Sequence, residues 1–383
     1  FLGTLIGELI ALDALTGEPC SDFGVNGRVD LSKGAGSVEL GEYSITSPPA
    51  ILGDLVIVGS AIGDNRATDL ERGIVRAIDA QTGSIQWLWD PIPKSTNDKA
   101  RATWNGDSNL STGAANAWAP LTADPSSGLI YVPTSSPSPD FFGGERLGDN
   151  LYSNSIVALN GFTGELVWFQ QLVRHDLWDY DIPAQPTLTT IRRQGEVHQA
   201  VVVVTKTGML FAFDRDSGEP IHEIEERPVP QSTVPGEITS PTQPFSTIEA
   251  LANRDPVTKR DAFGIIFFDK LSCKRQISKF GSKGIFTPPS LRGIIMRPGY
   301  AGGSNWGGVA VDPQRQVAVT NVNEVPALVR LIPRGDLERL KTEGRLKGWQ
   351  ITEQRGTPYY LARRIFLSPL NPVSYTHLTL PTT

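Results

Sequence analysis

The sequence has very little cysteine, and it contains no long apolar run or basic patch. Only Cys20 and Cys273 occur, which excludes a disulfide framework and a paired metal-thiolate motif but leaves one long-range disulfide open. No apolar run reaches the roughly 18 residues of a membrane helix, and the opening FLGTLIGELIALDA lacks the basic region and cleavage site of a signal peptide. The formal charge of −6, with both signs interspersed, argues against nucleic acid and favours a small polar substrate.

Glycine and proline, by contrast, are abundant. The 38 glycines and 29 prolines exceed average usage, and no long segment keeps an uninterrupted helical periodicity. The length of 383 residues would suit two or three domains, but large β-propellers and barrels exceed the usual domain size as one body. We therefore expect a turn-rich, all-β protein in which residues 1–370 form one unit.

A short internal repeat favours one β architecture over the others. The pattern Ala-x-Asp/Asn-x-x-Thr/Ser-Gly occurs four times, at Ala11–Gly17, Ala77–Gly83, Ala158–Gly164 and Ala212–Gly218. Each copy ends an apolar alternating run, which is typical of a strand followed by a tight turn. In two copies a tryptophan, Trp87 or Trp168, follows four residues after the glycine, where its ring can pack between neighbouring units. These features predict a β-propeller, whereas a β-sandwich would not explain the recurring turn.

The segments between the repeats differ in character. We expect a strand at 47–60, a hairpin at 199–214 with Lys206 at its rim, and no blade pattern in an unstructured or foreign tail at 371–383. The remaining segments are interpreted as a polar insertion, a glycine-rich loop and a surface excursion, at 91–128, 140–154 and 222–295 respectively.

One stretch combines acids and rings at unusual density. The segment His175–Pro186 holds three aspartates, Trp178, Tyr180 and two prolines, and the prolines exclude a helix of useful length. A carboxylate beside large rings can have a raised pKa and act as a base. An ordinary polar loop with rings packed beneath it is the alternative interpretation.

Several ordered motifs resemble the membrane-bound pyrroloquinoline quinone (PQQ) dehydrogenases of the glucose and quinate type. The motifs cover most of residues 1–370 and are LDALTGEPCSDFG, SPPAILGDLVIVGSAIGDN, HDLWDYDIPAQPTL, FTPPSL, GGSNWGGVAVDP and RLIPRGDL. The resemblance implies an eight-bladed propeller, incomplete here at both ends, with PQQ on its axis beside Ca²⁺ or Mg²⁺. It also implies a place on the periplasmic face of the bacterial inner membrane, with ubiquinone as electron acceptor. The membrane would be reached only through segments outside this chain.

The resemblance also assigns roles to individual residues. Asp179 is the expected catalytic base, which removes a hydroxyl proton while hydride leaves the same carbon for the quinone. Lys206 is expected to contact the quinone oxygens and stabilise their negative charge, and Trp118 is expected to be the flat surface on which the cofactor stacks. The expected cofactor pocket also includes Asp64, Trp306 and Asn321. The structural alternatives are a turn cap for Asp179, an exposed hairpin lysine for Lys206 and a core ring for Trp118.

Departures from the family pattern affect the metal and the substrate. The adjacent cysteines of the methanol-type branch are missing, which favours the sugar and cyclitol branch. Where related enzymes supply a metal-ligating asparagine, this chain has Ser136 and Ser138, whose hydroxyls are poorer ligands for a hard cation. The metal ligands are therefore unassigned, and an acidic ligand and a substrate-side histidine are expected upstream of Phe1.

The main hypothesis is a PQQ-dependent dehydrogenase that oxidises a sugar or polyol hydroxyl, with glucose to gluconolactone as the first candidate reaction. Oxidation of quinate or shikimate is the alternative within the same family. A non-enzymatic propeller scaffold is the alternative from another class, but it has no reason to keep Asp179, Lys206 and Trp118 together.

Overall fold

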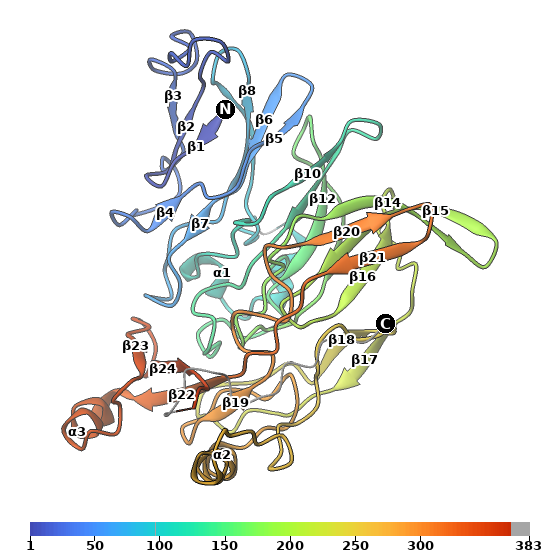
Figure 1. Ribbon diagram of the computed structural model, residues 1–383. Coiled ribbons are helices and arrows are strands. Elements are labelled where there is room, and N and C mark those ends of the chain that lie inside the picture. Colours follow the sequence, from blue (N-terminus) through green and yellow to red (C-terminus); the bar gives the residue numbers. More distant parts are fainter. Residues whose placement is uncertain (96, 369–383) are drawn as a thin grey trace.

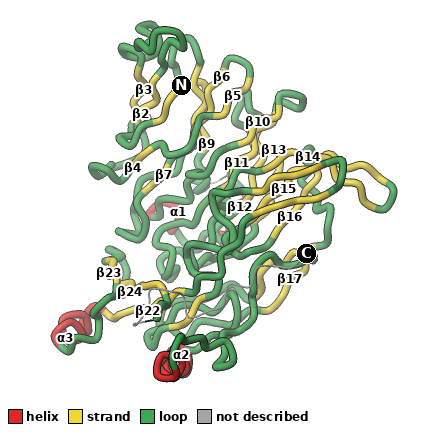
Figure 2. Tube along the Cα trace, viewed as in Figure 1, coloured by secondary structure: helices red, strands yellow, loops and turns green. Residues whose placement is uncertain are grey.

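The computed structural model describes residues 1–95 and 97–368. It consists of antiparallel sheets of two to four strands, coloured from the blue N-terminal strands to the red C-terminal ones (Figure 1). The hairpin at 309–320 departs from chain order, because it lies beside the strand at 187–193. Most of the backbone between the strands is loop (Figure 2). The prediction of a turn-rich, all-β chain is confirmed.

The strands of the first half form four sheets. They are β1 (Leu2–Gly3), β2 (Glu8–Ile10) and β3 (Arg28–Asp30); β4 (Tyr43–Ser44) and β7 (Ala61–Ile62); β5 (Ala50–Leu52), β6 (Leu55–Val58), β8 (Val75–Asp79) and β9 (Ile85–Trp89); and β10 (Thr122–Asp124), β11 (Leu129–Pro133), β12 (Ser155–Asn160) and β13 (Leu166–Gln171).

The second half adds four more sheets and the longest helix. The strands are β14 (Thr187–Arg193), β15 (Glu196–Val204) and β16 (Leu210–Asp214); β17 (Ile224–Pro228) and β18 (Thr242–Ser246); β20 (Val309–Asp312) and β21 (Val317–Thr320); and β19 (Ile294–Met296), β22 (Ala327–Pro333), β24 (Tyr359–Ile365) and β23 (Gln350–Thr352). The helical elements are η1 (Lys99–Thr103), α1 (Ser108–Ser111), α2 (Phe267–Phe280), η2 (Arg334–Asp336) and α3 (Leu337–Thr342).

All four repeat copies form the same turn. The first acidic or amide residue of each copy, such as Asp13 or Asp79, accepts hydrogen bonds from the backbone N–H groups two and three residues later. Its own carbonyl accepts the N–H of the repeat glycine at 2.8–2.9 Å. That glycine has a positive φ in every copy, for example 72° at Gly83, which is why no other residue type suits the position.

The two repeat tryptophans join neighbouring units. The indole N–H of Trp87 donates to Gly161 O at 2.9 Å, and that of Trp168 donates to Arg215 O at 3.0 Å. A Cβ built on Gly218 would lie 2.5 Å from the Trp168 ring, so each ring lies directly on the turn of the next repeat. The structural role predicted for these rings agrees with this arrangement.

Two segments differ from the sequence-based expectations. The strand expected at 47–60 is a hairpin, β5 and β6, because Gly53 has a φ of 56° and turns the chain. The expected surface excursion at 222–295 contains the hairpin β17–β18 and the helix α2. Only Asp269, Cys273 and Ile277 of α2 are buried, so its apolar stripe is too narrow to give a clear helical pattern.

The largest hydrophobic cluster lies under the acidic-aromatic stretch. It joins Trp178 and Tyr180 to the loop residue Phe286 and to strands of other sheets through Phe211 and Leu361. Both cysteines are free thiols. Among the described residues, none of the helices has both the length and the apolar character needed to cross a bilayer. The tail expected at 371–383 lies outside the described residues.

Candidate active site

The stretch between β13 and β14 is a buried, internally braced loop. Asp176 accepts hydrogen bonds from the backbone N–H groups of Trp178, at 3.2 Å, and Tyr180, at 3.0 Å. The two rings are anchored in the core, where the indole N–H donates to Thr287 O at 2.8 Å and the tyrosine hydroxyl donates to Pro298 O at 2.7 Å. The alternative of an ordinary polar loop with rings packed beneath it does not account for the aspartates, because Asp176, Asp179 and Asp181 are buried as well as the rings.

His175 fixes the start of this loop. Its Nε2 lies 2.6 Å from Oε1 of Glu237 and its Nδ1 lies 2.8 Å from Gly148 O. Both ring nitrogens are therefore used by structural partners, and the pKa of Glu237 is lowered by this contact although burial opposes it. This arrangement suits a role of His175 in orienting the loop.

The backbone of Asp179 has an uncommon conformation, and each of its two carboxyl oxygens faces one cation. Its φ is 59°, a left-handed value that aspartate tolerates better than most residues but that still costs free energy. Lys206 Nζ lies 2.5 Å from Oδ1, and Arg363 Nη1 lies 4.0 Å from Oδ2. The side chain of Asp179 is only 9% exposed, so the carboxyl is almost withdrawn from solvent.

Asp181 connects the lysine to the predicted cofactor surface. Its Oδ2 accepts hydrogen bonds from Lys206 Nζ and from the Trp118 indole N–H, both at 3.0 Å. Its Oδ1 accepts the backbone N–H of Ser136 at 2.8 Å. The Lys206 ammonium also lies 5.7 Å from the centre of the Trp118 ring. A hairpin lysine predicted from the sequence is thus fixed between two carboxylates and an indole.

The carboxyl groups of Asp179 and Asp181 differ in pKa. Burial raises the pKa of Asp179 well above its usual range, against the lowering effect of Lys206, and Asp181 and Asp64 raise it further. Burial also acts to raise the pKa of Asp181, but Lys206 and the hydrogen bonds from Ser136 outweigh it, so that pKa is lowered. The pKa of Lys206 is raised because the two carboxylates outweigh its burial. Asp181 and Lys206 therefore form an ion pair, while Asp179 is the stronger base.

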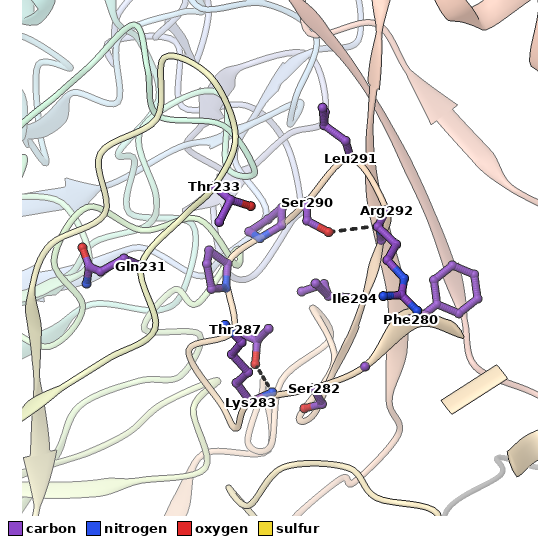
Figure 3. A pocket seen from close by; sticks show the side chains of 14 residues that line it. Gln231, Thr233, Phe280, Ser282, Lys283, Thr287, Ser290, Leu291, Arg292 and Ile294 are labelled. Carbon is purple, nitrogen blue, oxygen red and sulfur yellow. Dashed lines mark hydrogen bonds between the residues drawn. The ribbon is translucent and has the colours of Figure 1, made fainter. Parts of the chain in front are cut away.

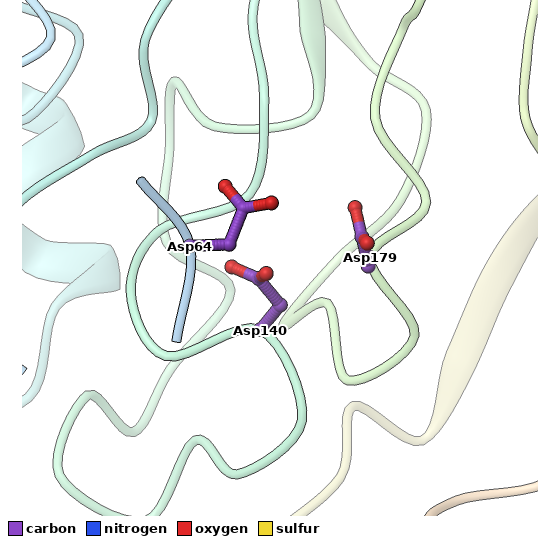
Figure 4. Close-up of side chains that lie close together, drawn as sticks. All are labelled: Asp64, Asp140 and Asp179. Carbon is purple, nitrogen blue, oxygen red and sulfur yellow. The ribbon is translucent and has the colours of Figure 1, made fainter. Parts of the chain in front are cut away.

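Three carboxyl groups of the site lie close together (Figure 4). One oxygen of each of Asp64, Asp140 and Asp179 lies within 4.8 Å of the others. Burial raises the pKa of Asp140 well above its usual range, and the charge of Asp64 raises it further; Asp64 itself is exposed, on the open side of the group. Asn65 holds Asp140 in place by donating to Oδ2 at 2.7 Å and accepting its backbone N–H at 3.0 Å.

The charge balance of this group favours a divalent cation. Four carboxylates, the three above and Asp181, lie around one ammonium and one guanidinium. Full ionisation would leave an excess of two negative charges in a largely buried volume, which is unfavourable without a cation. Carboxylate oxygens are the ligands that Ca²⁺ and Mg²⁺ prefer, so the donor set fits the expected metal.

Four of the five predicted cofactor residues line one cavity of 320 Å³ next to this group. Asp64, Trp118, Lys206 and Trp306 all contribute to its wall, together with Asp181. The two indoles lie with ring centres 6.0 Å apart and planes inclined by 44°. Such a cavity, with flat rings and one ammonium, suits a planar, negatively charged quinone.

Asn321 is not among the residues that line this cavity. Its side chain lies against Gly307, the residue after Trp306, where a built Cβ would meet Asn321 Oδ1 at 1.8 Å. Trp306 itself is 68% exposed, so this side of the cavity is the open one. The larger cavity of 540 Å³ elsewhere in the molecule contains none of the predicted site residues.

The serine pair that replaces the expected asparagine has other partners. Ser136 Oγ donates hydrogen bonds to Asp176 and Asp181, and Ser138 Oγ donates to Ala67 O at 2.6 Å. Both hydroxyls are committed within the protein, which agrees with the doubt about them as metal ligands. Asp140, two residues further on, supplies a carboxylate from the same loop.

Two residues of the site were missed at the sequence level. Asp140 lies in a Ser-Pro-Ser-Pro-Asp segment, and an acid directly after such a rigid turn could have been noticed as a hard-cation ligand. Arg363 lies on β24 within a Leu-Ala-Arg-Arg run that carries no local sign of a site. It reaches Asp179 from a different sheet, with its guanidinium 4.8 Å from the Tyr300 ring centre and 6.0 Å from that of Phe141.

Comparisons with known proteins agree with this geometry. The family model described as PQQ: glucose/ethanol/alcohol dehydrogenase, beta-propeller domain, matches residues 1–377. Quinoprotein glucose dehydrogenase A of Acinetobacter calcoaceticus is 38% identical over 371 residues, which are 95% of this chain and 46% of that protein. Quinate/shikimate dehydrogenase (quinone) of Acinetobacter baylyi is 33% identical over 377 residues, 97% of this chain and 46% of that protein.

Solved structures support the fold. A europium-containing methanol dehydrogenase superimposes with a TM-score of 0.62 at 22% identity, covering 96% of this chain and 54% of that one. The predicted β-propeller and the resemblance to the glucose and quinate type are confirmed. The chain spans about half the length of the relatives it matches, 46% of each of the two named above. It belongs to the PQQ-dependent dehydrogenase family, as part of its beta-propeller domain.

Proposed function

We propose that this chain forms the part of a PQQ-dependent dehydrogenase that removes a proton from a sugar or polyol hydroxyl while hydride leaves the same carbon. The observation that carries the proposal is the buried contact of Asp179 with Lys206, since Lys206 also lines the Trp118 cavity although Asp179 itself does not. PQQ, when bound, supplies the two-electron acceptor, and a divalent cation offsets the charge of the carboxylates. Trp118, Trp306 and Lys206 would hold the cofactor, and Asp64 and Asp140 would hold the cation beside Asp179.

Asp179 has the properties that the proton transfer needs. The ammonium of Lys206 engages Oδ1 at 2.5 Å, which leaves Oδ2 to accept the substrate proton. Because burial raises the pKa of Asp179, its carboxylate is a stronger base than an exposed one. Asp176 holds the backbone on both sides of Asp179, and the contact with Lys206 orients the carboxyl group.

The finer assignments are part of the same proposal. Glucose, with gluconolactone as product, is the first substrate to test, and ubiquinone is the proposed acceptor at the periplasmic face of the inner membrane. The relatives named above support these assignments through their names only, one as a glucose dehydrogenase and one as a quinate/shikimate dehydrogenase (quinone).

One observation favours a carboxylate-bearing cyclitol such as quinate as second candidate. The guanidinium of Arg363 is positioned by Tyr300 and by Gln350, which accepts its Nε–H at 3.3 Å. Within residues 1–95 and 97–368, neither Nη group of Arg363 forms a hydrogen bond. A fork of free N–H groups beside the base matches the geometry of a carboxylate.

The test of the main proposal uses the complete gene product. It is loaded with PQQ and Ca²⁺ or Mg²⁺, cofactor uptake is followed by absorbance, and dye reduction is measured with glucose and with quinate. Stoichiometric uptake and substrate-dependent dye reduction are expected. Absence of uptake by the complete protein would favour a scaffold without cofactor.

Arg363→Gln tests the second candidate. If a substrate carboxylate binds Arg363, the variant should lower kcat/KM for quinate by about 10- to 100-fold, the range expected for a charged hydrogen-bonded contact, with a much smaller change for glucose. Arg315→Gln, which removes the same charge from an 82% exposed side chain in the turn between β20 and β21, is the matched control. Equal losses on both substrates would contradict a role in carboxylate recognition.

A further inference from the structure

A second polar cavity lies between the last sheet and the two C-terminal helices. It measures 480 Å³, and six of its nine lining residues are cationic while none is acidic. The nine are Gln276, Lys279, Phe280, Arg292, Arg330, Arg345, Lys347, Trp349 and Arg364. Phe280 and Arg292, which lie side by side in Figure 3, also line the adjoining 540 Å³ cavity drawn there. Such a concentration of positive charge is unexpected in a chain whose formal net charge is −6.

Strand pairing explains how the cations come together. Arg330 on β22 lies opposite Ala362 on β24, and residues opposite each other point to the same face of a sheet. Arg364, two residues after Ala362, therefore points to that face as well. Arg363 points to the other face, toward Asp179, so the cationic cavity and the candidate active site lie on opposite faces of one sheet.

Neutral groups hold the arginines of this cavity in place. Arg292 donates to Lys279 O at 2.6 Å and to Ser278 O at 3.1 Å, at the C-terminal end of α2. Arg330 donates to Leu291 O at 2.9 Å, and Arg364 donates to Gln276 Oε1 at 3.2 Å. The carbonyl partners fix the guanidinium groups of Arg292 and Arg330 without cancelling their charge.

The cluster is electrostatically unfavourable as it stands. Burial lowers the pKa of Arg330, and the charge of Arg345 lowers it further. Glu343 contacts Arg345 at 3.3 Å, but it also pairs with Arg339 at 3.1 Å. A bound anion would relieve the repulsion among the cations, because opposite charges at short range favour each other most where water is partly excluded.

We propose that this cavity is a binding site for a phosphate-bearing anion. Several arginine forks directed from different elements suit an oxyanion with multiple charges and acceptors, which a single carboxylate does not provide. The volume lies within the roughly 300–1,000 Å³ of small-molecule sites, so it accommodates more than an inorganic ion. The rings of Trp349 and Phe280, already in contact with Arg364 and Lys279, supply an apolar wall for the rest of such a molecule. A soluble phosphate ester and a phospholipid headgroup share this chemistry.

Calorimetric titration of the complete protein with pyrophosphate tests the site without relying on catalysis. Saturable binding is expected, and Arg330→Gln and Arg345→Gln should each weaken it by about tenfold, the effect of losing one charge-assisted contact. Lys341→Gln on α3 removes the same charge from a side chain that pairs with Glu338 outside the cavity, and it should change the affinity by less than about twofold. Circular dichroism verifies that each variant is folded, and Arg345, with a side chain 51% exposed, is the substitution that perturbs packing least.

Competition for the pyrophosphate site distinguishes the two sources of phosphate, because the membrane segments expected outside this chain would bind vesicles by themselves. Displacement of pyrophosphate by soluble short-chain phosphatidylglycerol, with none by short-chain phosphatidylcholine, would assign a lipid headgroup. Pyrophosphate binding that short-chain phosphatidylglycerol does not displace would assign a soluble phosphate ester. Absence of saturable pyrophosphate binding, or an equal loss in Lys341→Gln, would overturn the proposal.

Discussion

Lys206 offers a direct way to measure the electrostatics of the candidate site. Its side chain is 7% exposed and bridges Asp179 and Asp181, which are 9% and 8% exposed. Lys206→Gln removes the ammonium and leaves two buried carboxyl groups without their partner. Breaking a buried ion pair on one side costs about 3–5 kcal/mol, so the free energy of unfolding should fall by about that amount at neutral pH.

The loss should depend on pH in a defined direction. The pKa of Lys206 is raised in the folded protein. Its contribution to the free energy of unfolding is therefore complete at any pH below the ordinary pKa of lysine, and it is lost only as the pH rises through the raised pKa. The lowered pKa of Asp181 contributes stability above the ordinary carboxyl pKa, and this is lost as the pH falls through the lowered value. Without the ammonium both carboxyl pKa values rise, so the folded variant takes up protons that the wild type does not.

The assay is urea unfolding at about pH 5.5 and about pH 7.5. One extra bound proton changes stability by about 1.4 kcal/mol per pH unit, so the deficit of Lys206→Gln should be about 1–2.5 kcal/mol smaller at the lower pH. Adding Asp179→Asn to the variant should recover part of the loss, because it removes the unpaired charge. Lys259→Gln, at an exposed position, is the control. A deficit below about 1 kcal/mol at both pH values would refute the buried ion-pair interpretation.

Two further predictions concern the repeat turn and the carboxylate group. Gly218→Ala should lower the free energy of unfolding by about 2–3 kcal/mol, since its Cβ would meet the Trp168 ring at 2.5 Å. Gly34→Ala has a similar φ of 79° but no atom within 4 Å, so it isolates the backbone term, and an equal loss there would contradict the docking role of the ring. Asp140→Asn should raise the Ca²⁺ concentration for half-maximal PQQ uptake by about tenfold; an unchanged concentration would exclude Asp140 as a ligand.

The repeat turn shows what could be predicted about the fold. Its Asp/Asn and Gly positions act through local hydrogen bonds and a positive φ, so the sequence alone was sufficient to place strands and turns around it. The helix α2 could not be predicted in this way, because most of its residues are exposed and its position depends on the sheet beside it. The hairpin at 47–60 was misjudged because Gly53 was treated as part of a strand.

The site shows a similar division. Asp179, Lys206 and Trp118 could be named because each lies in a motif of several residues, and the structure brings them together through Asp181. Arg363 comes from the last described sheet, and only tertiary folding places it within 4.0 Å of Asp179. The catalytic and cofactor roles of all these residues are still predictions.

The central claim is that Asp179 is the base of a PQQ-dependent oxidation, and one comparison tests it most directly. The complete gene product and its Asp179→Asn variant are loaded with PQQ and Ca²⁺, and dye reduction is measured with glucose and quinate, with Asp216→Asn at an exposed turn as control. The account predicts that Asp179→Asn takes up PQQ but loses activity by about 10²- to 10⁴-fold, the contribution of a positioned base, while Asp216→Asn keeps it. Full activity in a PQQ-loaded Asp179→Asn variant would contradict the assignment.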